Sequence, residues 1–131
     1  MISFDEFGDI LEEIANSMPK EIYDRLNGGV NLLPDEKLHH ESREGFPLFV
    51  LGEYHVNRLG RYINIYYGSF AHTYSNLPIE LLKEKMEHTL KHEFLHHLES
   101  LAGEKGLEIV DEIRLNKYRQ MFQRYKKTDE E

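Results

Sequence analysis

Apolar residues recur at helical spacing in three parts of the chain. The first lies near the start, at Phe4, Phe7, Leu11 and Ile14. This spacing places them on one face of a helix. Ser3 and Glu6 form the Ser-x-x-Glu pattern of a capping box, which predicts that the helix begins there. A second, short helix is predicted from Pro19 to Leu26, because proline favours a first turn and Gly28 favours a stop.

Between residues 30 and 67 the pattern changes to short runs of β-forming residues. Residues 30–33, 48–56 and 62–67 are rich in branched and aromatic side chains and predict three strands. A turn at 58–61 separates the last two strands, so we expect them to pair as a hairpin. Residues 35–46 are polar and charged and predict a loop. Residues 68–76 predict a second loop.

A long helix is predicted from Pro78 to Gly103, since proline is favoured in a first turn and glycine at a C-terminal cap. Its apolar side holds Leu90, Phe94, Leu98 and Leu101. A last helix is predicted over 107–125, with an apolar side formed by Ile109, Ile113, Tyr118 and Phe122. Together the elements predict one α+β domain spanning residues 1–131, with a small sheet, a central long helix and flanking helices.

The charge balance narrows the classes of partner. The chain has 24 acidic and 16 basic residues, a net charge of −8 with neutral histidines, which argues against nucleic acid and anionic membranes. It has no cysteine, so any zinc must be held by His, Asp or Glu. No apolar run is long enough to cross a membrane, and the acidic start does not resemble a signal peptide. We therefore expect a cytoplasmic protein.

The predicted long helix contains a His-Glu-x-x-His motif at His92, Glu93 and His96. Histidines four residues apart lie about 40° apart on a helix, so their rings can share one metal ion. Glu93 points about 100° away from His92 and can reach a water on that ion without being a ligand. The motif predicts Zn²⁺ held by His92 and His96, with Glu93 as the general base of a hydrolase.

The other histidines are expected to have different roles. His88 lies on the face of the motif and would be a supporting group, a spare ligand or an exposed residue. His97 lies beside the apolar face, and we expect it to be buried, hydrogen-bonded and structural. His39 and His40 fall in the polar loop and have no helical partner, so we expect them to be solvated rather than bound to metal.

A zinc ion in a hydrolase takes a third protein ligand. Glu99 is the predicted ligand, because it lies on the same helical face as His92 and His96 and its side chain leans back towards them. The alternatives are water, a loop histidine, or a carboxylate of the last helix, which would have to fold back across the site. The carboxylates in question are Glu108, Asp111 and Glu112.

Several segments carry a resemblance to a known family: residues 51–54, 60–63, 65–68 and 92–97, the last with a doubled histidine at His96 and His97. With these segments the chain resembles the small zincin-like metallopeptidase family of bacteria, formerly a domain of unknown function. The resemblance implies a minimal zincin-like fold, a bound zinc and peptidase activity without a settled substrate. Better-understood relatives have Gly and then Asp where this chain has Glu99 and Ala102, and Ala102 cannot bind zinc.

The leading hypothesis is a zinc-dependent metallopeptidase that acts on a peptide or protein substrate. An extended substrate would pair with an exposed strand edge, most simply that of the strand at 62–67. We expect the tyrosines of that strand to be half-buried sheet residues rather than oxyanion donors. The alternative hypothesis is a non-catalytic metal- or peptide-binding module of the same fold, which the missing Asp favours.

Overall fold

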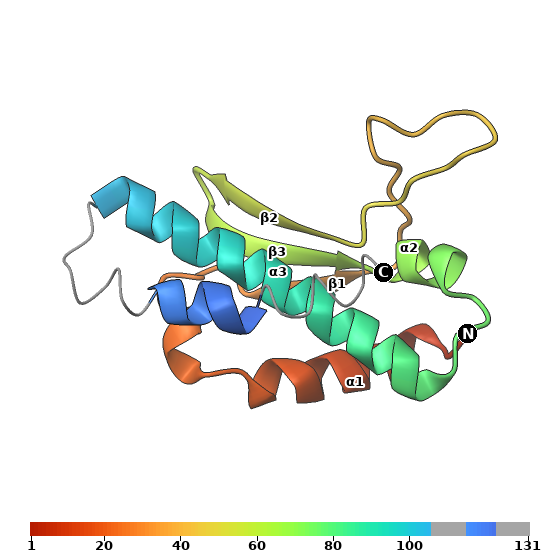
Figure 1. Ribbon diagram of the computed structural model, residues 1–131, viewed down its shortest axis with the longest axis horizontal. Helices are drawn as coiled ribbons and strands as arrows, with labels where there is room; N and C mark the ends of the chain where they lie inside the picture. The colour runs from red at the N-terminus through yellow and green to blue at the C-terminus, as the bar shows by residue number, and fades with distance from the viewer. Residues whose placement is uncertain (106–114, 123–131) are drawn as a thin grey trace.

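A computed structural model describes residues 1–105 and 115–122 of the chain. In these residues the fold is mixed α+β, with helices around a three-stranded sheet (Figure 1). In chain order the elements are helix α1 (Phe4–Ser17), 3₁₀ helix η1 (Lys20–Tyr23), strands β1 (Val30–Leu33), β2 (Gly52–Asn57) and β3 (Gly60–Tyr66), and helices α2 (Tyr67–Thr73) and α3 (Ile79–Lys105). Residues 115–122 are also helical.

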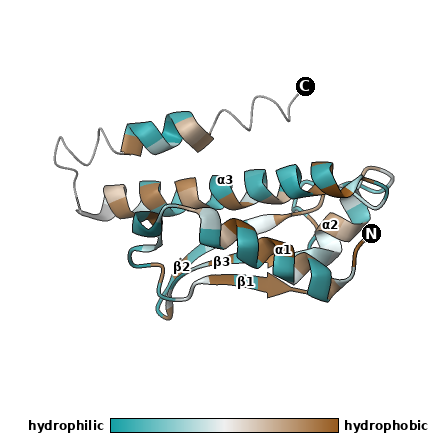
Figure 2. Ribbon diagram, turned by 90° about the horizontal axis from the view of Figure 1, so that it is seen from below, coloured by the Kyte–Doolittle hydropathy of each residue, from teal (hydrophilic) through white to brown (hydrophobic). Residues whose placement is uncertain are grey.

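The strand order is β1-β3-β2, so β3 is central and β1 and β2 are the edges. Strand β1 runs parallel to β3, and β2 pairs with β3 as an antiparallel hairpin. Ile63 and Ile65 of β3 are buried on one face of the sheet, and α1 and α3 lie against that face (Figure 2). Because side chains alternate along a strand, Tyr62, Asn64 and Tyr66 point to the opposite face.

Helix α1 begins as predicted, with the complete capping box of Ser3 and Glu6. Its buried residues Phe7 and Leu11 face the core. The Phe7 ring packs against Phe70 of α2, with ring centroids 5.1 Å apart. Apolar periodicity therefore identified both the helix and the face that it buries.

Helix α3 crosses the sheet and supplies five residues of the core cluster: Leu82, Met86, Leu90, Phe94 and Leu95. Leu90 and Phe94 are fully buried, and Leu98 packs at the edge of the cluster, as the apolar stripe predicts. The helix extends to Lys105 and passes through Gly103, so the predicted end at Gly103 is wrong. Glycine permits a C-terminal cap but does not impose one when the following residues keep helical hydrogen bonds.

The second predicted strand is shorter than expected. Residues 48–51 do not belong to β2. Instead residues 48–50 pair locally with residues 37–39, through bonds from His39 N–H to Leu48 O (2.8 Å) and from Val50 N–H to Lys37 O (2.7 Å). Residues 37–50 thus form a projecting arm, seen above α2 in Figure 1. The backbone hydrogen bonds of residues 48–50 are therefore made within the arm and not in the sheet.

Two further predictions are wrong. Residues 68–76 are not all loop, because α2 covers Tyr67–Thr73 and buries Ser69 and Phe70. The short helix after Pro19 ends at Tyr23, and Arg25 takes a positive φ of 63° before Leu26. In both places packing of the core determines the backbone conformation, because the local preferences of these residues are weak.

The last predicted helix is described only over 115–122. Its side chains Leu115, Tyr118 and Phe122 are buried, and the Tyr118 hydroxyl donates a hydrogen bond to the Glu21 carboxylate of η1. Ile109 and Ile113, predicted for the same apolar side, lie outside the described residues. Among the helices that the structure describes, none is both long and apolar enough to cross a membrane.

Candidate metal centre

His92 and His96 lie on α3 with their Nε2 atoms 3.0 Å apart. The ring planes are nearly perpendicular, at 84°, and the ring centroids are 4.5 Å apart. Two nitrogens bound to one tetrahedral zinc ion, each at about 2.1 Å, lie about 3.4 Å from one another. The donor pair therefore fits a shared ion with only a small change in ring torsions.

Glu93 lies between the two histidines in sequence but is buried, with 7% of its surface exposed. Its side chain lies beneath Gly52 of β2. A Cβ atom on Gly52 would be 3.3 Å from Glu93 Cγ and 3.0 Å from Thr89 Cγ2. Glycine at this position lets β2 approach α3 closely enough to cover the carboxyl group.

Burial raises the pKa of Glu93 to about 7, and the negative charge of Glu53 contributes in the same direction. A hydrogen bond with the Tyr54 backbone opposes this rise in the pKa. A carboxyl group whose pKa lies close to neutrality can both accept and return a proton, as a general base in a hydrolase must.

His97 is fully buried, as predicted, and bridges three parts of the fold. Its Nε2 lies 2.8 Å from the Asp24 carbonyl oxygen, and its Nδ1 lies 2.9 Å from the Tyr54 hydroxyl. Because a carbonyl only accepts, Nε2 must donate, which leaves Nδ1 to accept from Tyr54. Burial lowers the pKa of His97, so the ring stays neutral in this role.

Arg61 continues this chain of hydrogen bonds. Its guanidinium donates to the Tyr54 hydroxyl at 2.8 Å and to Ser100 Oγ at 2.6 Å. The chain of hydrogen bonds from Arg61 through Tyr54 to His97 thus connects β3 and β2 to α3 next to the motif. This network explains the second histidine of the pair His96-His97, which serves the fold and leaves His96 to face the solvent.

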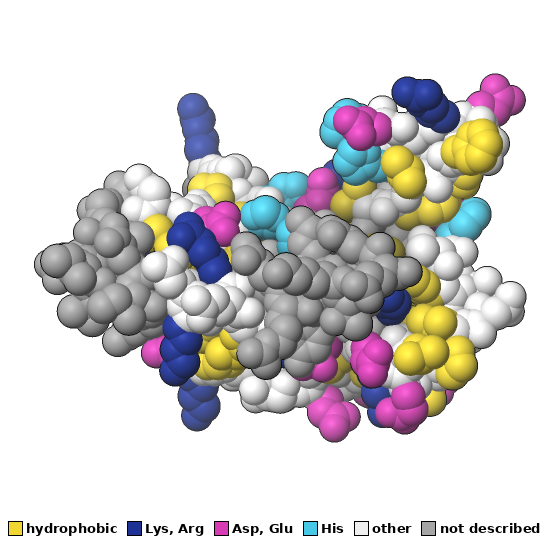
Figure 3. Space-filling model, in the orientation of Figure 1, with side chains coloured by type: hydrophobic (Ala, Val, Ile, Leu, Met, Phe, Trp, Pro, Cys, Tyr) yellow, Lys and Arg dark blue, Asp and Glu magenta, His cyan; other side chains and the backbone are white. Residues whose placement is uncertain are grey.

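The motif opens onto a cleft of about 1060 Å³ between α3, β2 and the arm. Its walls carry His92, Glu93 and His96 from α3, Glu53 and Tyr54 from β2, and Leu38, His39 and His40 from the arm. Figure 3 shows one group of histidine side chains on the arm and another on the body of the molecule beneath it. The arm histidines were expected only to be solvated. His40 is indeed 82% exposed, but both residues line the cleft, which loop composition gave no means of predicting.

The predicted third ligand, Glu99, lines the same cleft as His92 and His96, but its carboxylate pairs with a cation. Glu99 Oε1 lies 3.5 Å from Arg119 Nε on the helical segment 115–122. No three His, Cys, Asp or Glu side chains in the described part of the chain come together as a metal site. Glu108, Asp111 and Glu112, the alternative ligands, lie outside the described residues. The identity of the third ligand therefore stays a prediction.

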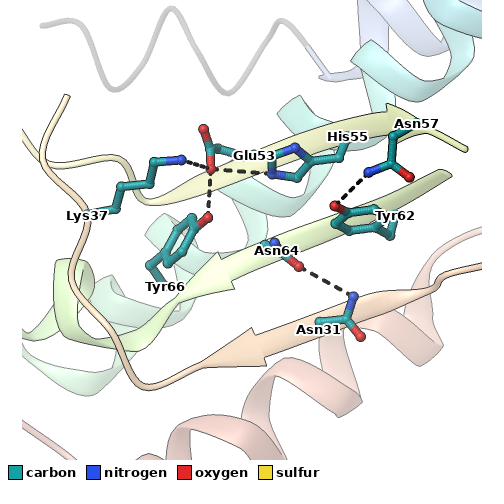
Figure 4. Close-up of polar contacts among 8 residues, drawn as sticks. All are labelled: Asn31, Lys37, Glu53, His55, Asn57, Tyr62, Asn64 and Tyr66. Atoms are coloured by element: carbon teal, nitrogen blue, oxygen red, sulfur yellow. Dashed lines mark hydrogen bonds and ion pairs between the residues drawn. The ribbon is translucent and has the colours of Figure 1, made fainter. Parts of the chain in front are cut away.

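A polar cluster on the far face of the sheet holds the base of the arm (Figure 4). Glu53 Oε1 accepts hydrogen bonds from Lys37 Nζ and from the Tyr66 hydroxyl, both at 2.6 Å. His55 Nε2 lies 3.4 Å from the same oxygen, and the His55 ring stacks on Tyr62. Burial acts to raise the pKa of Glu53, but the hydrogen bonds from Lys37 and Tyr66 outweigh it and keep this pKa below its usual range. Through the bond between Lys37 and Glu53, this cluster anchors the arm beside the cleft.

The strand edge beside the cleft is that of β2. The strand predicted at 62–67 as the substrate edge is β3, which has a partner on each side, so this prediction is wrong. Tyr66 N–H donates to Leu51 O, at the end of the hairpin ladder. Backbone groups alternate in direction along an antiparallel strand, so those of Gly52, Tyr54 and Val56 face outward, towards the cleft.

Comparison with solved structures finds a conserved hypothetical protein from Thermus thermophilus, with 31% sequence identity and a TM-score of 0.66. The match covers 77% of this chain and 98% of that chain. This chain belongs to the family of that protein. No family model and no curated protein matches the chain. The name of the T. thermophilus protein states no activity, so the function rests on the geometry of the site.

Proposed function

We propose that the protein is a zinc-dependent hydrolase of peptide bonds, built on a zincin-like fold. One observation carries the proposal: two imidazole Nε2 atoms converge to 3.0 Å beside a buried carboxyl group on the same helix. A solvated His/Glu-rich helix face would give no reason to bury Glu93 beneath a glycine of the neighbouring strand. The open cleft above the motif gives a substrate access to these groups.

The residues take the following roles. His92 and His96 would hold the zinc through neutral imidazoles. When bound, zinc would polarise the scissile carbonyl and make a water molecule more acidic. Glu93 takes the proton of the attacking water and later gives it to the leaving amine. The Arg61–Tyr54–His97 network holds β2 against α3, and so keeps Glu93 beside the motif.

An extended peptide would bind along the edge of β2. The outward backbone groups of Gly52 and Val56 offer a strand the partners that it needs for β-addition. Such a peptide passes between β2 and the arm, across the mouth of the cleft. We also propose the cytoplasm as the compartment, because the lack of cysteine favours a reducing environment.

The proposal is tested first by metal content. Purified protein dialysed against zinc-free buffer should retain about one zinc ion per chain, since the Nε2 atoms of His92 and His96 converge to 3.0 Å. His92→Ala and His96→Ala should each abolish retention. His72→Ala is the matched control, because His72 lies on α2, is 55% exposed and is not on the cleft. Full zinc in both motif variants would refute the proposal.

A second candidate is a metal-binding module without catalysis, which the pairing of Glu99 with Arg119 favours. The two functions differ in whether the ion keeps a position open to small ligands. Cobalt-substituted protein distinguishes them, because binding of a small anion to an open position changes the visible spectrum. A spectrum unchanged by such anions would favour the module.

A further inference from the structure

The ring of His39 is restrained by several contacts on the arm side of the cleft. We propose that His39 is a catalytic residue that donates a hydrogen bond from Nε2 to the oxygen that becomes negative during peptide hydrolysis. This inference rests on the proposed function, and it gives the arm a chemical role.

Three contacts restrain His39. Its backbone N–H donates to Leu48 O at 2.8 Å within the arm. Its Nδ1 accepts a hydrogen bond from the Glu41 backbone N–H at 3.0 Å. Its ring also stacks on that of His40, with centroids 4.2 Å apart and planes 29° apart. A ring held on the backbone, on one nitrogen and on one face has little freedom left to lose when it binds a substrate.

The bond to Nδ1 determines the tautomer. A nitrogen that accepts a hydrogen bond carries no proton, so the proton of the neutral ring is on Nε2. A metal ligand must offer a lone pair at the binding nitrogen, whereas an oxyanion needs a donor. His39 is therefore prepared to donate from Nε2 and is unsuited to complete the zinc site through that atom.

The placement of His39 agrees with this role. His39 lines the large cleft together with His92, Glu93 and His96. It also lines a neighbouring cavity of about 300 Å³ that again includes His92 and Glu93. The arm is held at its base by the Lys37–Glu53 ion pair at 2.6 Å and by the bond from Lys37 N–H to Ser69 Oγ at 2.9 Å. His39 thus lines the cleft of the motif from a fixed support.

Several other side chains with donors near the cleft are engaged in hydrogen bonds elsewhere. The Tyr66 hydroxyl donates to Glu53, and the Tyr54 hydroxyl proton is directed to His97 Nδ1. Lys37 Nζ is bound to Glu53. Tyr62 and Asn64 lie on the far face of the sheet (Figure 4). His39 also lines the cleft, and its Nε2–H is left as a donor because its Nδ1 accepts the hydrogen bond from Glu41 N–H.

The step that His39 would assist is addition of water to the peptide carbonyl. A lone pair of the water oxygen forms a bond to the carbonyl carbon, and a water proton passes to Glu93. The π electrons of the carbonyl move to its oxygen, which becomes negative and accepts the hydrogen bond from His39 Nε2. When the C–N bond breaks, the oxygen electrons restore the carbonyl and the nitrogen takes the proton from Glu93. His39 keeps its own proton throughout.

The test uses the full chain and two readouts. The first readout is the affinity for methylphosphonate, a tetrahedral anion, measured by titration of cobalt-loaded protein and followed by its visible absorption. This affinity reports the hydrogen bond from His39 without any turnover of substrate. His39→Ala should weaken this binding by about 10- to 100-fold, the effect of losing a hydrogen bond to a charged group. His39→Gln, which keeps an N–H near the Nε2 position, should recover part of it. Cleavage of a random decapeptide mixture, counted as new amino termini, should fall by about 10²- to 10³-fold in His39→Ala.

Arg43→Ala is the matched control, since Arg43 belongs to the same arm but does not line the cleft. It should leave both readouts unchanged. Unchanged methylphosphonate binding in His39→Ala would overturn the inference, as would loss of zinc in that variant. Wild-type protein that holds no metal would instead refute the proposed function, and the role of His39 with it.

Discussion

Replacement of His97 by alanine should separate the stability of the fold from the chemistry of the site. His97 is fully buried and makes two hydrogen bonds, to the Asp24 carbonyl and the Tyr54 hydroxyl. Each partner left without a bond costs about 1–3 kcal/mol, and the missing ring leaves a cavity. We expect His97→Ala to lower the free energy of unfolding by about 3–5 kcal/mol, which is a large fraction of the stability of one domain.

The measurement is urea unfolding of metal-free protein, followed by circular dichroism at pH 7.5. His40→Ala serves as the control, because its side chain is 82% exposed and should contribute less than about 0.5 kcal/mol. Tyr54→Phe and the double variant complete a thermodynamic cycle. The two sites share one hydrogen bond, so the cycle should give a coupling of at least about 0.5 kcal/mol.

The same residue predicts a direction for the pH dependence. The unfolded chain binds a proton at His97 below about pH 6.5, whereas burial lowers the pKa of this ring in the folded chain. The folded state therefore loses stability as the pH falls through about 6.5 towards the lower folded pKa. His97→Gln cannot titrate and should lose less stability than the wild type over this window. A loss below about 1 kcal/mol in His97→Ala, or an identical pH dependence in His97→Gln, would contradict the proposed hydrogen-bond chain.

Three other predictions concern the site directly. Glu93→Gln should keep zinc, measured by metal analysis, and should lose at least about 10²-fold in peptide cleavage, because it removes the general base; loss of metal would make Glu93 a ligand instead. Gly52→Ala should lower the free energy of unfolding by about 1–3 kcal/mol, since its Cβ would lie 3.0 Å from Ile65 Cδ1; unchanged urea unfolding would count against the close approach of β2. Glu99→Ala should weaken zinc binding by at least about tenfold if Glu99 is the third ligand. Unchanged zinc affinity there would leave Glu99 as the partner of Arg119.

Much of the backbone could be predicted from local signals. The capping box at Ser3 and Glu6, the apolar stripe of α3 and the hairpin of β2 and β3 each depend on residues close together in sequence. Their physical causes are side-chain capping, amphipathic burial and turn-linked pairing, which act within a few residues. The spacing of His92 and His96 belongs to the same class, because one helix suffices to bring their rings together.

Elements without a strong local preference were decided by tertiary packing. Helix α2 begins Tyr67-Gly68-Ser69, a poor helical sequence, yet it forms because Phe70 is buried against Phe7. Strand β3 is central rather than an edge because β1 pairs with it in parallel, and such long-range pairing leaves no local trace. The exposed strand edge beside the cleft is therefore that of β2 and not that of β3.

The site shows the same division. The sequence alone was enough to propose His92 and His96 as a metal-binding pair and Glu93 as the base, and to predict the buried, hydrogen-bonded His97, because all of them lie on one helix whose period is known. Only the folded chain brings β2 over Glu93 and the arm over the cleft. His39 is more than 50 residues from the motif, so no spacing rule connects the two. Their approach depends on the sheet and on the anchoring of Lys37 to Glu53, contacts whose energies arise only once distant segments pack together.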